Sequence, residues 1–192
     1  MALEGYYVKQ VERSDIRDFI ETWHYSGNIN GCIADYCFAL YRPDGVMVGA
    51  MFYGRMAMAG QWKRFSDRPD NVIELRRLCC IDDTPRNAES FFIARTLKIL
   101  RKVWGRGIVV SYADLEYGHE GTIYKASNFK MIGKIKGARV IMFEGKRYHD
   151  KTIRTKYNGD LKPYAKRIRA ALEAGEAFYK TTAGKMTYIY QL

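Results

Sequence analysis

Hydrophobic and polar positions alternate along most of this chain in a way that predicts short strands separated by helices. Residues 6–11, 36–41 and 46–53 are rich in aromatic and β-branched side chains, which is typical of strands. The last two runs are joined by Arg42-Pro-Asp-Gly45, a sequence that favours a tight turn. Further strands are expected over residues 72–81, 107–111 and 187–191, and over 130–135 and 139–144 as a hairpin around Lys136-Gly137.

Four other segments are expected to be helices, and in two of them, residues 14–23 and 90–103, hydrophobic residues recur at helical spacing. The first is expected to begin at Ser14, whose hydroxyl can cap a helix, and to end near Trp23. The others are expected over residues 90–103, 122–128 and 162–178. Between strands and helices lies a basic and aromatic loop at residues 60–71.

The elements follow the order strand, helix, loop, three strands, helix, strand, helix and two strands. This order resembles that of the GNAT (Gcn5-related) acyltransferase fold over about residues 6–144. The resemblance implies an α+β (α/β) protein with a central mixed sheet flanked by helices, followed by a C-terminal basic helix and strand. No linker or repeat divides the chain, so we expect a single GNAT-like domain over residues 1–192, with its core at 6–144 and an extension at 145–192.

Net charge narrows the choice of partner. The 192 residues include 32 lysines and arginines against 21 aspartates and glutamates, a formal charge of +11. Such an excess favours a polyanion such as nucleic acid, and tyrosines interleave with the basic residues where they could stack on bases. A basic surface that is merely solvated is the alternative.

Hydropathy and cysteine spacing bear on the cellular location of the protein. No apolar run approaches 18 residues, and the N-terminus lacks the apolar core of a signal peptide, so we expect no membrane span and a cytoplasmic location. The four cysteines show no C-x-x-C spacing and are expected to be reduced, buried thiols.

The segment 111–133 is the most informative one for chemistry. A buried strand ends at a polar exit containing Asp114, and a short helix bearing Tyr124 follows. Open α/β sheets place ligands where strands end. The run Gly121-Thr-Ile-Tyr124-Lys-Ala-Ser-Asn-Phe129 is similar to the way GNAT acyltransferases present a tyrosine after their central strand.

A set of motifs in fixed order carries a more specific resemblance. They are Trp23-His24-Tyr25, Glu74-Leu75-Arg76-Arg77-Leu78, Asn87-Ala-Glu-Ser-Phe91, Ser111-Tyr-Ala-Asp114 with the Tyr124 run, Gly145-Lys-Arg-Tyr-His149 and Lys185-Met-Thr-Tyr-Ile-Tyr190. Together they resemble the Mom family of bacteriophage DNA-modification proteins. This resemblance implies a transferase that converts adenine in DNA to N6-carbamoylmethyladenine and so protects phage DNA from host restriction.

Five residues are the expected catalytic group. His24 fits a base of near-neutral pKa by its type, and Asp114 could orient it or accept a proton from N6. Tyr124 could donate to a leaving group or oxyanion, and Tyr25 could stack on a base. The resemblance marks Arg77, rather than Arg76 on the opposite face of an alternating strand, as the functional arginine. Capping, packing and surface pairing are the structural alternatives.

The donor is expected to meet Asn87 and Ser90 at a helix N-terminus, and Ser111 on the central strand. GNAT enzymes hold the pyrophosphate of coenzyme A with a glycine-rich turn here, whereas this chain has Thr84-Pro-Arg-Asn-Ala-Glu-Ser90. The turn has no glycine and Pro85 removes one N–H donor, so coenzyme A in its usual pose is disfavoured. The donor stays open between an acyl-CoA and glycyl-tRNA, and a charged tRNA is a candidate partner.

The 60–71 loop is the expected DNA contact, through Trp62, Lys63, Arg64 and Arg68. An enzyme acting on adenine N6 must flip the base out of a duplex or take single strands, and in a duplex such a loop could fill the gap. A mobile surface loop is the alternative.

Three points stay open at this level. The histidines His24, His119 and His149 could with Asp114 ligate iron or zinc, but they lack a ligand spacing, so no metal site is assigned. The oligomeric state is undetermined and a homodimer is open. The rival functions are a GNAT acetyltransferase using acetyl-CoA on a protein or small amine, and a non-enzymatic DNA-binding module.

Overall fold

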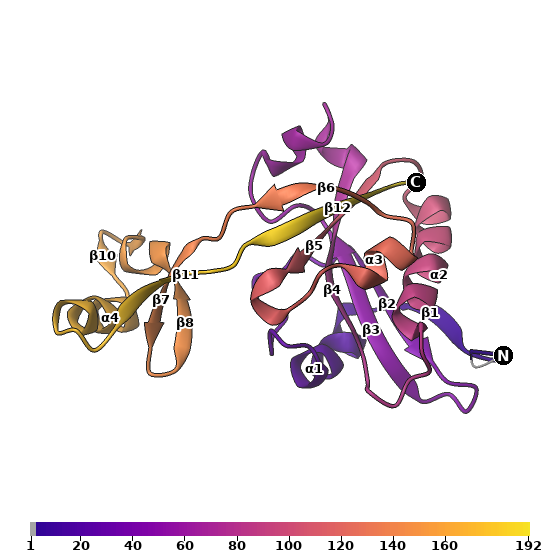
Figure 1. Cartoon of the computed structure of the whole chain (residues 1–192), viewed down its shortest axis with the longest axis horizontal. Coiled ribbons are helices and arrows are strands. Elements are labelled where there is room, and N and C mark those ends of the chain that lie inside the picture. Colours follow the sequence, from indigo (N-terminus) through magenta and orange to yellow (C-terminus); the bar gives the residue numbers. More distant parts are fainter. Residues whose placement is uncertain (1–2) are drawn as a thin grey trace. The chain divides into compact units, whose positions relative to one another are not determined.

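Seven strands of the chain form one mixed sheet in the computed structural model, which describes residues 3–192 (Figure 1). The strand order is β1-β2-β3-β4-β5-β12-β6. The pairs β1–β2, β2–β3 and β3–β4 are antiparallel, and β4 is parallel to β5. The strands are β1 (Tyr7–Val11), β2 (Tyr36–Tyr41), β3 (Met47–Gly54), β4 (Val72–Cys80), β5 (Ile108–Asp114), β6 (Lys130–Ile135) and β12 (Lys185–Gln191).

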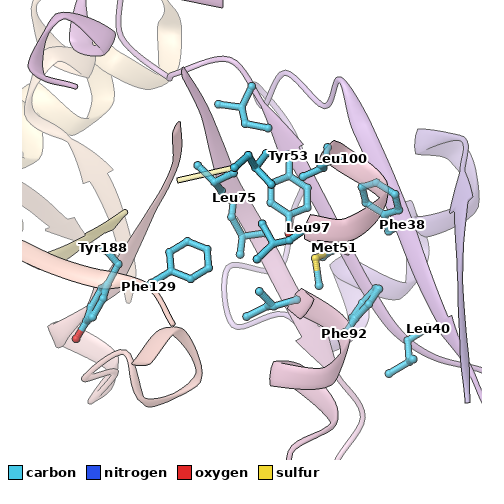
Figure 2. Close-up of a cluster of buried hydrophobic side chains, with 14 of the residues drawn as sticks. Phe38, Leu40, Met51, Tyr53, Leu75, Phe92, Leu97, Leu100, Phe129 and Tyr188 are labelled. Atoms are coloured by element: carbon cyan, nitrogen blue, oxygen red, sulfur yellow. The ribbon is translucent and has the colours of Figure 1, made fainter. Parts of the chain in front are cut away.

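Helices cover both faces of this sheet, because its central strands are apolar on both sides. In β2, Cys37 and Ala39 pack with Ile16 and Ile20 of α1 (Arg13–Trp23). The alternate residues Phe38 and Leu40 pack in a second cluster with α2 (Ala88–Val103) and α3 (Thr122–Ala126). Figure 2 shows part of this second cluster, with Phe92 of α2 among the strand side chains.

The beginning of α1 differs from the sequence expectation. The helix begins at Arg13, and the carboxylate of Asp15 accepts a hydrogen bond of 2.9 Å from the Glu12 N–H. The expected cap at Ser14 is therefore wrong, since Ser14 already lies in the first turn.

A β-bulge in β4 is the main irregularity of the sheet. Phe52 of β3 pairs with Arg77, and the next residue, Tyr53, pairs with Leu75, so Arg76 is an extra residue in β4. The bulge reverses the alternation of side chains: Leu75 and Leu78 both pack in the α2 cluster. Arg77 consequently lies on the α1 face with Phe52, and not on the face of Leu75 where strict alternation along β4 would place it.

The same bulge coincides with the end of a ladder. In the described chain, the parallel pairing of β4 with β5 runs from Val72 and Ile108 to Leu75 and Ser111. Beyond this point β4 continues to Cys80 and β5 to Asp114. Polar groups of both strands are thereby released from the ladder at one place in the sheet.

The chain divides into two compact units. The first contains the described residues through Ala113 together with Glu120–Gly133 and Met186–Leu192, and the second contains Asp114–His119 and Lys134–Lys185. In the second unit, β11 (Phe178–Thr181), β7 (Arg139–Phe143) and β8 (Lys146–His149) form a sheet against α4 (Pro163–Glu173), and β9 (Lys156–Tyr157) pairs with β10 (Asp160–Leu161).

Two predictions for this region are wrong, one about strand pairing and one about the length of a helix. Strands β6 and β7 do not form a hairpin with each other, because β6 belongs to the seven-stranded sheet and β7 pairs with β8 and β11. The helix expected over residues 162–178 ends at Glu173, where Gly175 adopts a φ of 76°, and Phe178 already starts β11.

The remaining expected strands and helices are found within a few residues of their predicted ends. The 60–71 loop contains two short 3-10 helices, Gln61–Arg64 and Pro69–Asn71. Within residues 3–192, every helix is too short or too polar to traverse a bilayer. The single-domain assignment stays a prediction.

Burial of one residue anchors the segment after α1, and this can be tested. Ile29 is fully buried while Ile33 is 43% exposed. We expect Ile29→Ala to lower the free energy of unfolding by about 2–5 kcal/mol, and Ile33→Ala by less than about 1 kcal/mol. Denaturant titration followed by tryptophan fluorescence reports on the first unit, because Trp23, Trp62 and Trp104 all lie there. Equal losses in the two variants would contradict this packing.

Candidate active site

Tyr124 occupies the point where β4 and β5 part. Helix α3, which carries it, begins after Gly121, whose φ is 74° and where a Cβ would overlap the Tyr188 ring. The Tyr124 ring centre lies 5.6 Å from that of Phe129 and 5.4 Å from that of Tyr188. The glycine is thus required for α3 to pack closely enough to bring Tyr124 over the sheet.

The protonation state of Tyr124 follows from this packing. Burial raises its pKa to about 12, although a hydrogen bond with Ser111 acts in the opposite direction. Tyr25, Glu74 and Tyr188 add to the rise in pKa, which places these groups around Tyr124. The phenol therefore stays protonated at neutral pH, and suits the donation of a hydrogen bond or proton better than the work of a base.

Ser111 serves this cluster rather than an exposed surface. It is fully buried, and its hydroxyl also donates to the carbonyl of Leu75 at 3.4 Å. Its expected contact with the donor stays a prediction.

His24 and Tyr25 form a second part of the site, directly after α1. The His24 side chain is buried, and its ring centre lies 4.2 Å from that of the half-exposed Tyr25. His24 Nδ1 accepts a hydrogen bond from the Ser26 N–H at 3.1 Å and contacts the Ser26 hydroxyl at 2.8 Å. Because the Ser26 N–H can only donate, Nδ1 must be the unprotonated nitrogen of the neutral imidazole. The proton is therefore on Nε2, and Nε2–H is a hydrogen-bond donor.

A buried ion pair on β4 was not among the candidates from the sequence. Glu74 Oε2 lies 3.6 Å from Arg76 Nη1, and the two side chains are only 13% and 9% exposed. Arg76 also donates to the carbonyl of Arg55 at 3.0 Å and to Cys32 Sγ at 3.8 Å. The signal available in the sequence was three charged residues inside an otherwise apolar strand.

Arg77 is held by the bulge itself. Its Nη1 donates to the carbonyl of Arg76 at 2.8 Å, and its side chain is half-buried. Arg77, the arginine selected from the sequence, thus directly follows Arg76, the bulge residue that forms the ion pair.

Asn87 and Ser90 lie where expected, at the N-terminus of α2. Asn87 precedes the helix with a φ of 69°, and its carbonyl accepts a hydrogen bond of 3.0 Å from the Ser90 hydroxyl. Such a helix start can bind an anionic group, and the donor-binding role of both residues stays a prediction.

Asp114 belongs to the second unit and has its partners there. Its Oδ1 accepts from the Glu116 N–H at 3.2 Å, and its Oδ2 lies 3.0 Å from Lys185 Nζ. The side chain is only 6% exposed. These contacts hold the carboxylate in place, while its expected action on His24 or on N6 stays a prediction.

The 60–71 loop presents cations beside aromatic rings. Lys63 Nζ lies 5.6 Å from the centre of the Trp62 ring, and the Arg64 guanidinium lies 5.6 Å from that of Phe65. Arg68 pairs with Asp70 at 2.6 Å on the surface, which offsets part of its charge. The loop is tied to β5, since Gln61 Nε2 donates to the Tyr112 hydroxyl at 2.8 Å.

No group of three or more His, Cys, Asp and Glu side chains comes together as a metal site within residues 3–192.

Comparison with known proteins agrees with the resemblance seen in the sequence. The model of the Mom protein family matches residues 5–192. The methylcarbamoylase mom of Escherichia phage Mu is 32% identical over 141 residues, which are 71% of this chain and 57% of that protein. The chain thus matches somewhat more than half the length of this curated relative.

Solved structures resemble the fold at low sequence identity. An acetyltransferase of Bacillus subtilis in complex with CoA has a TM-score of 0.52 at 10% identity, covering 97% of this chain and 99% of that one. NAA60 of Arabidopsis thaliana in complex with acetyl-CoA has a TM-score of 0.54 at 11% identity, covering 97% and 98%. Spermidine/spermine N-acetyltransferase SpeG of Vibrio cholerae gives 0.54 at 9%, covering 100% and 95%. The expected GNAT-like fold is confirmed.

The raised pKa of Tyr124 predicts a loss of stability in alkali. An exposed tyrosine ionises near pH 10 in the unfolded chain, whereas Tyr124 in the fold does so near 12. Its contribution is complete below pH 10 and is lost as the pH rises from about 10 to 12. Between pH 9 and 11, unfolding free energy from tryptophan fluorescence should fall by about 1 kcal/mol more in the parent chain than in Tyr124→Phe. Parallel curves would contradict the assignment.

Proposed function

Because the chain belongs to the Mom protein family, we propose that it is a transferase that modifies DNA, with N6 of adenine as its target. The product proposed is N6-carbamoylmethyladenine, which would protect phage DNA from host restriction. The name of the phage Mu relative, a methylcarbamoylase, supports this proposal. The observation that carries it is the cluster of Tyr124, Ser111 and Tyr25 where β4 and β5 part, within a chain that matches the family over residues 5–192.

The residues of the first unit suit transfer of an acyl group. Addition of an amine to a carbonyl places negative charge on the carbonyl oxygen, and preorganised donors stabilise it. Tyr124 is protonated, and His24 presents Nε2–H, so both can donate to that oxygen or to the leaving group. Adenine N6 is a weak nucleophile that must lose a proton, and Asp114 keeps the role of acceptor proposed from the sequence.

The donor that fits the product is an activated glycine. Acylation of N6 by glycine gives an amide with a free glycyl amine. That amine can attack ring carbon C6 through a five-membered transition structure, and the bond from C6 to the former N6 then breaks. The former N6 becomes the terminal amide and the glycine nitrogen stays on C6, so the atoms balance without a further reagent. Glycyl-tRNA supplies glycine as an activated ester.

The second unit offers a surface for such a polyanion. It contains 14 lysines and arginines against seven aspartates and glutamates, and thus +7 of the chain's +11. Exposed aromatic side chains lie among these charges, and the Lys162 ammonium is 4.1 Å from the centre of the Tyr157 ring. Basic residues beside exposed rings suit unpaired nucleotides, because phosphate and base are contacted together.

An acetyltransferase that uses acetyl-CoA is the rival function. The solved relatives of the fold support it, but the turn before α2 contains Pro85 and no glycine. Acetyl-CoA also supplies two carbons without the amide nitrogen of the proposed product.

The proposal predicts a heavier adenine nucleoside in DNA from cells that express the chain. Mass spectrometry of digested plasmid DNA should show deoxyadenosine carrying one carbamoylmethyl group. Tyr124→Phe should reduce this product about 10²–10⁴-fold, because a positioned acid is removed. Tyr7→Phe is the matched control, since Tyr7 stacks on Tyr41 at 5.3 Å in strands β1 and β2, and should leave the yield unchanged. Unmodified nucleosides in the presence of folded protein would reject the function.

The donor is tested separately with purified components. Protein, DNA and glycyl-tRNA carrying ¹⁵N-glycine should yield a product with the label on N6 and the original adenine nitrogen in the amide. Label in the amide would reject the rearrangement. Modification with acetyl-CoA in the absence of tRNA would favour the rival function.

A further inference from the structure

A cavity of about 790 Å³ lies beneath the 60–71 loop, within the first unit, and has no role in the chemistry described above. Its walls are mostly apolar and include the rings of Tyr36, Trp62 and Trp104 and the side chains of Met56 and Met58. Cavities of 300–1,000 Å³ with apolar walls hold ligands of the size of a nucleoside or a drug. The space is thus large enough for one nucleotide's base and sugar.

The cavity has the chemistry of a base-binding site. Flat aromatic rings stack on nucleobases of any kind, and methionine adapts its shape to the edges of a flat ligand. Two carboxylates, Asp35 and Asp70, also line it. A carboxylate accepts hydrogen bonds from an exocyclic amine, which adenine has and thymine lacks.

Positive charge lies beside the cavity where a nucleic acid backbone would run. Trp62 is a wall of the cavity, and Lys63 and Arg64, which follow it directly, are exposed. The Lys63 ammonium lies over the Trp62 ring, at 5.6 Å from its centre. A phosphate bound by these cations would leave its base next to the aromatic wall.

One series of polar contacts runs from the cavity to Glu74, beside the reacting cluster. Arg55, a lining residue, accepts a hydrogen bond from Arg76, the partner of Glu74. Gln61, next to Trp62, donates to Tyr112, which packs with Trp62 and Met56 and so lies on the face of β5 opposite to Ser111. Glu74 raises the pKa of both Tyr112 and Tyr124, after burial itself, so it lies close to both tyrosines. The cavity is therefore linked to the proposed site of chemistry through Arg55, Arg76 and Glu74.

We propose that this cavity receives a nucleobase with an exocyclic amine, the target adenine, after it has unstacked from DNA. The base stacks on Trp62, the backbone is bound by Lys63 and Arg64, and Asp35 accepts from the amine. The inference rests on the proposed function for its choice of DNA as the substrate. It goes further by assigning a location and a set of residues to base recognition.

Photo-crosslinking tests the location without any chemistry on the base. The probe is a G·C duplex with a single A·T pair whose adenine is replaced by 8-azidoadenine, mixed with the full chain in the absence of a donor. After irradiation, peptide mass spectrometry should place the adduct on residues 56–62, Tyr36 or Trp104. The same duplex with an unmodified adenine, read by fluorescence anisotropy, measures binding.

Variants distinguish stacking from simple contact. Trp62→Leu should reduce affinity and crosslink yield about fivefold or more, and Trp62→Phe, which keeps a ring, should restore most of both. Met58→Ala should reduce the crosslink, whereas Met131→Ala should not. Met58 and Met131 are 69% and 51% exposed, and only Met58 lines the cavity.

The outcomes separate this inference from the proposed function. A duplex that binds but crosslinks elsewhere, or does not bind, overturns the inference, as does a Trp62→Leu variant that is folded and crosslinks normally. A crosslink in the cavity without modified nucleosides in cells would reject the proposed function and leave the base site standing. Modified nucleosides together with a crosslink outside the cavity would reject the base site and support the proposed function.

Discussion

The extra residue in β4 is the constraint on which the candidate site depends. Arg76 interrupts the alternation of the strand at the residue after the last pairing with β5, so β4 and β5 part where Tyr124 lies over the sheet. The buried pair of Arg76 with Glu74 holds the bulge in one conformation, because either charge alone would be costly to bury. One irregularity thus sets the opening between two strands and the charges beside it.

Strands and helices with clear periodicity could be predicted from the sequence, because residues such as Phe38 and Leu40 face a different core from Cys37 and Ala39. The partners of each strand and the exact end of a helix could not be predicted in this way. Nothing local to residues 130–144 indicates that β6 joins the large sheet while β7 joins a small one. Likewise, apolar residues continue after Glu173, and only the left-handed backbone at Gly175 ends α4 there.

The candidate site shows the same division. Tyr25 and Tyr124, separated by almost a hundred residues, were singled out by type and motif and prove close enough to interact. The tautomer of His24 could not be predicted, since it depends on the N–H of Ser26. Glu74 and Arg76 were overlooked as a pair in the core, because charged residues on a strand are usually solvated and the bulge leaves no signature in residue type.

The uneven distribution of charge between the two units has a kinetic consequence. The first unit has 18 lysines and arginines against 14 aspartates and glutamates, a net charge of only +4, while the second carries +7. Affinity for a polyanion falls steeply with ionic strength as counterions are released, whereas interactions among buried groups such as Tyr124 are screened little. Under the proposed function, added salt would therefore raise the Michaelis constant for the polyanion and leave turnover at saturation nearly constant.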